Sequence, residues 1–122
     1  MAPHNERGKE GEEEARKYLL SNGYNIYESN WRFHHFELDI IAEKDGMLVV
    51  VEVKTRSSES LLTPEEIVDK RKIRRTVEAA DAYIRFKNIN LPVRFDIIGI
   101  FVQPNGTTSI DHIEDAFLAP LN

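Results

Sequence analysis

The alternation of apolar and polar positions begins with a helical pattern. Within residues 6–21, Glu12, Ala15 and Leu19 fall on one stripe of a helix. Gly23 follows at a position where helices commonly end, because glycine readily adopts the left-handed backbone conformation found there. The pattern therefore predicts an amphipathic helix that carries one glutamate on its packing stripe.

Strand patterns follow this helix. Residues 24–31 are typical of a strand, and the β-rich segments 36–44 and 47–55 flank Asp45-Gly46. Asp-Gly favours a two-residue hairpin turn, since both of its residues must adopt positive φ angles there. The sequence therefore predicts an antiparallel hairpin in the middle of the chain.

The second half of the chain has the pattern of a helical crossover between two parallel strands. Thr63-Pro64-Glu65-Glu66 has the form of a capping box with proline at the first helical position, so a helix is expected from there to Phe86. Strands are expected over residues 93–102 and 107–113. A strand, a helix and a strand in succession form a parallel βαβ unit. We therefore expect an α/β fold with an αβββαβ core and a mixed central sheet flanked by helices.

The hairpin also predicts where its charged residues lie relative to one another. If its loop holds only two residues, Asp39 stands opposite Glu52 and Glu37 opposite Lys54, with all four on one face. The other face is then apolar, with Phe36, Leu38, Ile40, Ala42, Val49, Val51 and Val53. Two opposed carboxylates are destabilising unless the face is open to solvent, one pKa is raised, or a divalent cation lies between them.

These residues resemble a nuclease superfamily. Asp39 followed by Glu52-x-Lys54, with Glu12 on a preceding helix, resembles the PD-(D/E)XK superfamily, which has the restriction-endonuclease-like core also used by Holliday junction resolvases. Leu38 stands where the name pattern of that superfamily has proline. The chain is more similar still to the bacterial YraN-like family of predicted endonucleases over residues 8–102. The motifs that carry this similarity are Gly8-x-x-Gly11-Glu12, Asn30-Trp31-Arg32, Glu37-Leu38-Asp39-Ile40-Ile41-Ala42, Val51-Glu52-Val53-Lys54-Thr55-Arg56 and Arg94-Phe95-Asp96.

The resemblance implies a metal-dependent endonuclease that hydrolyses phosphodiester bonds in DNA, including branched or repair-intermediate structures. Asp39, Glu52 and Glu12 would bind Mg²⁺ or Mn²⁺, and Lys54 would act in catalysis beside the attacking water. Glu37 is expected as a supporting residue or a further ligand. For each role there is a structural alternative: an exposed acid pair, a salt bridge from Lys54 to Glu37, or an acid that favours the N-terminal end of the helix.

Length, composition and charge limit the number of domains and the kinds of partner. The 122 residues fit one domain, with a core over about 8–102 and a short tail over 103–122. The absence of cysteine excludes disulfides and thiolate zinc sites. The net charge of −5 argues against a protein that coats DNA without specificity. Residues 54–75, however, hold seven basic and four acidic residues.

From this basic stretch we expect Arg56, Lys70, Lys72 and Arg74 to bind nucleic acid, with DNA favoured over RNA. The alternative is a solvated basic helix face. The alternatives for the whole protein are a nucleic-acid-binding or protein-interaction module that lacks catalysis.

The remaining features give weaker expectations. The polar start of the chain and the shortness of its apolar runs predict a cytoplasmic protein without a membrane partner. A homodimer is expected by analogy alone. His34 and His35 are interpreted as loop residues that cannot share one metal ion, His112 as isolated, and Asp96 as structural.

Overall fold

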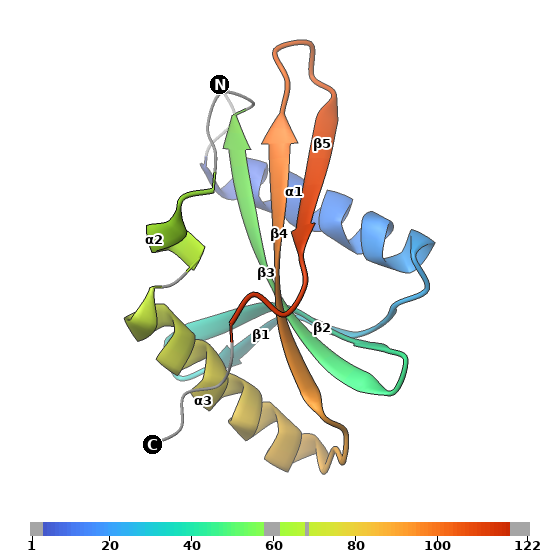
Figure 1. Ribbon diagram of the computed structural model, residues 1–122, viewed down its shortest axis with the longest axis vertical. Helices are drawn as coiled ribbons and strands as arrows, with labels where there is room; N and C mark the ends of the chain where they lie inside the picture. Colours follow the sequence, from blue (N-terminus) through green and yellow to red (C-terminus); the bar gives the residue numbers. More distant parts are fainter. Residues whose placement is uncertain (1–3, 58–61, 68, 118–122) are drawn as a thin grey trace.

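A computed structural model describes residues 4–57, 62–67 and 69–117 of the chain. Its elements, in chain order, are α1 (His4–Ser21), β1 (Asn25–Phe33), β2 (Phe36–Lys44), β3 (Met47–Ser57), α2 (Pro64–Ile67), α3 (Lys70–Lys87), β4 (Val93–Val102) and β5 (Thr108–Ile113). The five strands form one sheet in the order β1-β2-β3-β4-β5 (Figure 1). In the described part of the chain, no helix is apolar and long enough to cross a membrane.

The topology of the sheet confirms the predicted fold class. β3 and β4 run parallel, joined by the segment that contains α2 and α3, and every other neighbouring pair is antiparallel. The hairpin turn is also as predicted, because Asp45 and Gly46 have φ angles of 51° and 79° and Lys44 pairs with Met47. The sheet is mixed, and it is strongly twisted between the β1–β2 end and the β4–β5 end (Figure 1).

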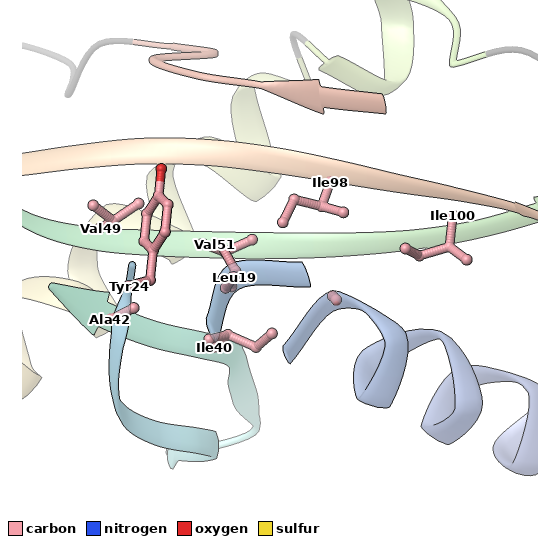
Figure 2. Packing of buried hydrophobic residues seen from close by; sticks show 9 residues of the cluster. Leu19, Tyr24, Ile40, Ala42, Val49, Val51, Ile98 and Ile100 are labelled. Atoms are coloured by element: carbon pink, nitrogen blue, oxygen red, sulfur yellow. The ribbon is translucent and has the colours of Figure 1, made fainter. Parts of the chain in front are cut away.

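One core lies between α1 and the sheet. Ala15 and Leu19, the apolar members of the predicted helical stripe, are fully buried there. They pack against residues of three central strands, namely Ile40, Ala42, Val49, Val51, Ile98 and Ile100 (Figure 2). This packing fixes α1, and with it Glu12, above the middle of the sheet.

A second core lies under α3, and it corrects the expected division of the hairpin into one polar and one apolar face. Ala79, Ala80 and Tyr83 of α3 pack there with Leu38 and Ile41 of β2, whereas Ile40 packs under α1. The expectation that Leu38 and Phe36 share a face with Ile40 was wrong. Helices cover both faces of the sheet, so β2 carries apolar side chains on both faces. The regular alternation of its side chains is broken at Asp39, because Leu38 and Ile40 lie on opposite faces.

The predicted crossover helix is two helices. The capping box is present, since Thr63 and Glu66 exchange hydrogen bonds of 3.1 and 3.2 Å through side chains and backbone N–H groups. It starts only the four-residue α2. Asp69 then caps α3 by accepting hydrogen bonds from the backbone N–H groups of Arg71 and Lys72. The second cap places Lys72 in the first turn of α3, close to β3.

Candidate active site

Asp39 lies where β2 and β3 stop pairing. Their backbone ladder ends at Ile40 and Val51, so Asp39 and Glu52 are the next residues beyond it rather than a ladder pair. The Asp39 carboxylate accepts a hydrogen bond of 2.8 Å from the backbone N–H of Val53. One side-chain oxygen thus takes the place of a backbone acceptor, which fixes the carboxylate between the two diverging strands.

Three carboxylates meet at this point. Glu12 of α1 and Glu37 and Asp39 of β2 each offer an oxygen, and these atoms lie within 4.8 Å of one another. All three residues are partly buried. Glu37, expected as a supporting residue or a further ligand, therefore belongs to the group. Its expected partner on β3 was Lys54, but the β2–β3 ladder ends at Ile40 and Val51; on the other side of β2, Glu37 pairs with Arg32 of β1.

The side chain of Asn30 hydrogen-bonds two of these carboxylates. Asn30 was not predicted to be part of the site. Its side-chain amide donates to Glu12 at 2.8 Å and to Glu37 at 3.2 Å. Its φ angle of 54° is unusual for a residue other than glycine. The Asn30-Trp31-Arg32 motif marked the position, but a sequence does not show that the amide bridges a helix and a strand.

A close contact between α1 and β3 sets the position of Glu12. A methyl group built on Gly11 would overlap the side-chain oxygen of Thr55, so only glycine allows this approach. Glu12 is the next residue of α1. Thr55 is the residue after Lys54, so the same contact brings the helix to the strand that carries the predicted catalytic lysine.

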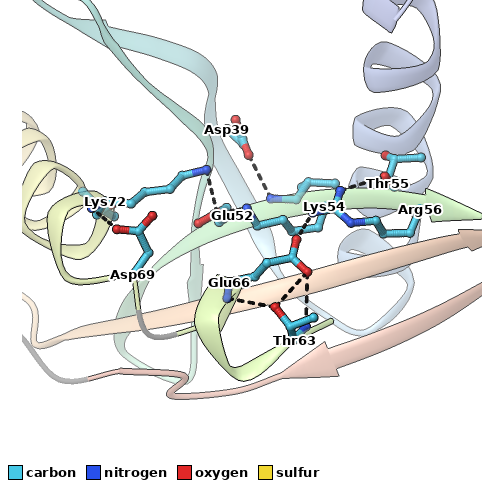
Figure 3. A network of polar contacts seen from close by, with 11 residues as sticks. Asp39, Glu52, Lys54, Thr55, Arg56, Thr63, Glu66, Asp69 and Lys72 are labelled. Carbon is cyan, nitrogen blue, oxygen red and sulfur yellow. Dashed lines mark hydrogen bonds and ion pairs between the residues drawn. The ribbon is translucent and has the colours of Figure 1, made fainter. Parts of the chain in front are cut away.

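Glu52 faces two lysines. One of its carboxylate oxygens lies 3.2 Å from the Lys54 ammonium and 2.9 Å from that of Lys72 (Figure 3). The predicted alternative of a salt bridge from Lys54 to Glu37 is therefore wrong. That oxygen is buried, and the two ammonium groups are its partners.

The electrostatics of the group follow from burial. Burial raises the pKa of Asp39 to about 7; the Val53 N–H opposes the rise, while Glu12 and Glu52 add to it. Burial lowers the pKa of Lys54, although Glu52 partly opposes this. Burial would also lower the pKa of Lys72, but the Glu52 carboxylate outweighs it and the net shift is upward.

A small cavity opens beside these groups. It has a volume of about 120 Å³ and lies between β2, β3 and the start of α3. Its walls include Glu37, Asp39, Glu52 and Lys72. Asp39 and Glu52 of the predicted metal set thus border the cavity together with Glu37, while Glu12 approaches Asp39 from α1.

The four predicted nucleic-acid-binding residues divide into two pairs. Arg56 forms an ion pair with Glu66 of α2, and Lys72 belongs to the Glu52 cluster. Lys70 and Arg74 lie on the exposed surface of α3. The structure therefore places two of the four at or near the site and leaves two on the open surface beside it.

A separate polar network surrounds Asp96, which is almost fully buried. Its carboxylate contacts Arg94, His112 and the backbone N–H of Asp115. Burial would raise the pKa of Asp96, but these hydrogen bonds outweigh it and lower the pKa overall. The network joins β4 to β5, as the structural interpretation of Asp96 expects. The view of His112 as isolated was wrong, because it also hydrogen-bonds Tyr18 at 2.9 Å.

The residues at the cavity fit a divalent cation. Carboxylate oxygens are the ligands that Mg²⁺ and Mn²⁺ prefer, and three of them from separate side chains lie within 4.8 Å of one another. Ionised carboxylates at this spacing repel one another; the cations beside them are Arg32, 3.5 Å from Glu37, and Lys72, which pairs with Glu52 and acts on Asp39 through its charge. A cation would relieve the repulsion among the three acids.

Comparison with known proteins places the chain in a family. The profile of the uncharacterised protein family UPF0102 matches residues 11–100. A UPF0102 protein of Parabacteroides distasonis is 60% identical over 120 residues, which is 98% of each chain. One from Bacteroides thetaiotaomicron is 56% identical over 99% of each chain. One from Flavobacterium psychrophilum is 44% identical over 96% of this chain and 98% of its own. The chain therefore belongs to the UPF0102 family, the YraN-like family that its motifs resemble.

Proposed function

We propose that this protein is a divalent-metal-dependent endonuclease that hydrolyses phosphodiester bonds in DNA. The observation that carries the proposal is the convergence of the Glu12, Glu37 and Asp39 carboxylates from a helix and a strand, next to a cavity bordered by Glu52 and Lys72. Carboxylates that bind a cation, placed beside lysines, are the groups that phosphoryl transfer requires.

The acids would hold Mg²⁺ or Mn²⁺. Glu12, Asp39 and Glu37 each offer an oxygen within 4.8 Å of the others, and Glu52 borders the adjoining cavity. When bound, the cation would lower the pKa of a bound water and offset the charge that develops on the phosphate. Asn30 orients Glu12 and Glu37 by donating to both, so the ligands are held before the cation arrives.

Lys54 and Lys72 would have different roles at the site. Lys54 lies on β3 with a lowered pKa, and its ammonium group would donate to a phosphoryl oxygen or hold the attacking water. Lys72 reaches Glu52 from α3, so it would hold that carboxylate in place. Lys70 and Arg74, exposed on the same helix, would contact the phosphates of the DNA backbone.

Cleavage assays test the proposal. Single-stranded, duplex, flapped and four-way-junction DNA are incubated with Mg²⁺ or Mn²⁺ and with the Asp39→Asn and Glu12→Gln variants. We expect metal-dependent cleavage of at least one substrate and a loss of at least 100-fold in both variants. Glu13→Gln is the matched control, since Glu13 is the exposed neighbour of Glu12 and pairs across the helix surface with Arg16.

Two results would contradict the nuclease. The first is cleavage that persists unchanged in Asp39→Asn, which would indicate a contaminating enzyme. The second is salt-dependent DNA binding with every substrate left intact, which would indicate a binding module that lacks catalysis.

A further inference from the structure

The tip of the β1–β2 hairpin and the first turns of α3 enclose a second cavity, which the proposed function does not use. It has a volume of about 290 Å³. The residues that line it are Phe33, His34, His35, Phe36, Arg75 and Glu78. Four of the six carry flat rings, and His34, His35, Arg75 and Glu78 are exposed to solvent.

A series of rings leads from the core to this cavity. Buried Tyr83 meets Trp31 edge-on with ring centroids 5.1 Å apart, and Trp31 is nearly parallel to Phe33, at 6° and 6.5 Å. The ring of Phe33 then lies 4.3 Å from that of His34. Phe33 is therefore held in place from behind, so a ring entering the cavity would meet a surface that is already ordered.

The cavity borders the candidate active site. Phe36 lines both cavities, and the next residue, Glu37, belongs to the carboxylate group. On the α3 side, Arg75 lines this cavity and Thr76 lines the other. A nucleotide bound here would be a close neighbour of the phosphate at the carboxylates.

Arg75 and Glu78 place one positive and one negative charge on the cavity wall, so the cavity has no excess of positive charge for a phosphate. The Glu78 carboxylate accepts hydrogen bonds from the amino groups of bases. The planar guanidinium of Arg75 stacks on a base or pairs with the flanking phosphate. Aromatic side chains contribute by stacking, which does not depend on sequence.

We infer that this cavity binds an unpaired nucleobase of the substrate, next to the phosphodiester bond that is cut. The inference rests on the proposed function and names its substrate class: DNA with at least one unpaired nucleotide, as in flaps and gaps, rather than intact duplex. A base that stays paired and stacked inside a duplex cannot place its face against Phe33 and His34.

Binding measurements test this without catalysis. Fluorescence anisotropy in EDTA at low salt compares a labelled single strand of mixed sequence with a blunt duplex of the same length. The variants Phe33→Leu and Arg75→Gln remove a ring and a guanidinium from the cavity. Their matched controls are Phe86→Leu and Arg85→Gln. These two side chains lie exposed near the C-terminal end of α3 and do not line the cavity.

We expect the wild-type protein to bind the single strand more tightly than the duplex. Phe33→Leu and Arg75→Gln should each raise the Kd for the single strand about tenfold, within the range of one stacked base, and leave the Kd for the duplex unchanged. Circular dichroism checks that Phe33→Leu folds, and the exposed Arg75→Gln variant tests the inference if it does not. Unchanged single-strand binding, or equal losses for both DNA forms, would overturn the inference.

The failure of this inference is distinguishable from that of the nuclease. If Asp39→Asn abolishes cleavage while cavity variants bind as wild type does, the nuclease stands and the base-binding cavity is wrong. If the cavity variants lose single-strand binding but no metal supports cleavage, the cavity stands and the nuclease is wrong.

Discussion

The Asp39 side chain does two things that ordinarily oppose each other. It replaces a backbone acceptor for the Val53 N–H, and it lies in a buried position beside Glu12 and Glu52, where its charge is disfavoured. Such a residue stabilises the fold when protonated and binds a cation when ionised. The contribution of Asp39 to stability should therefore depend on pH.

Removal of the Asp39 charge should stabilise the metal-free protein at high pH. The folded-state pKa of about 7 exceeds the ordinary value of 3.8, so the folded state holds a proton between these values and the unfolded state does not. The stability contribution is complete below pH 3.8 and is lost as pH rises through 7. Asp39→Asn keeps an acceptor oxygen, so in urea unfolding we expect it to exceed wild type by up to about 4 kcal/mol at pH 8.

The advantage of Asp39→Asn should disappear near pH 4. Asp45→Asn, at the exposed hairpin turn, controls for the loss of one carboxylate. An advantage of Asp39→Asn that is the same at pH 5 and pH 8 would show that Asp39 does not titrate as its burial predicts.

Lys54 should matter to cleavage and not to metal binding. Its ammonium group contacts Glu52, outside the group formed by Glu12, Glu37 and Asp39. In Lys54→Met we expect cleavage to fall about 100-fold or more while the Kd for Mn²⁺ stays within about threefold of wild type. Parallel losses of both would assign Lys54 to the support of the carboxylates instead of to the reaction.

At the scale of elements, the sequence predicted most of the fold and the positions of the carboxylates along it. The turn at Asp45-Gly46 and the strand 93–102 were predictable because turn chemistry and apolar runs are local. The change of facing at Asp39 was not, since it depends on packing against α3. The cap at Asp69 is local, but the capping box at Thr63 was expected to begin the whole helix. The same limit applies to Asn30, whose role exists only once α1 lies over β1 and β2.

The contact between α1 and β3 should be intolerant of a methyl group. Gly11→Ala would force Thr55 and the helix apart, which displaces Glu12, so we expect a loss of about 1–3 kcal/mol in stability and weaker Mn²⁺ binding. Adding Thr55→Ala removes the clashing oxygen and should restore part of both. Thermal unfolding and calorimetry measure the two effects.

Gly8→Ala is the control for helix propensity. An added methyl group at Gly8 meets nothing within 4 Å, so this variant should keep or gain stability and leave Mn²⁺ binding unchanged. If Gly11→Ala behaves in the same way as Gly8→Ala, α1 is not held against β3 as described.

For the whole molecule, the charge of −5 is divided unevenly. Several acids are gathered at the candidate site, whereas Lys70 and Arg74 lie exposed on α3. Such a protein would bind DNA through few phosphate contacts, with a bound cation offsetting part of the repulsion. Weak binding to a particular DNA structure, not broad coating, is the expected behaviour.

The salt dependence of DNA binding should report these few contacts. If Lys70 and Arg74 each contact a phosphate, Lys70→Gln and Arg74→Gln should each reduce the slope of log K against log salt by about 1. Arg85→Gln, at the other end of α3, should leave the slope unchanged. Slopes that are equal in all three variants would place the DNA on another surface.

Glu12, Glu37 and Asp39 are expected to bind a divalent cation together. Isothermal titration calorimetry of the metal-free protein with Mn²⁺ measures this directly. We expect saturable binding that is lost in Asp39→Asn and weakened at least tenfold in Glu12→Gln, and that is retained in Glu13→Gln. Mn²⁺ binding of equal affinity in Asp39→Asn and wild type, or no binding by the wild-type protein above pH 7, would contradict it.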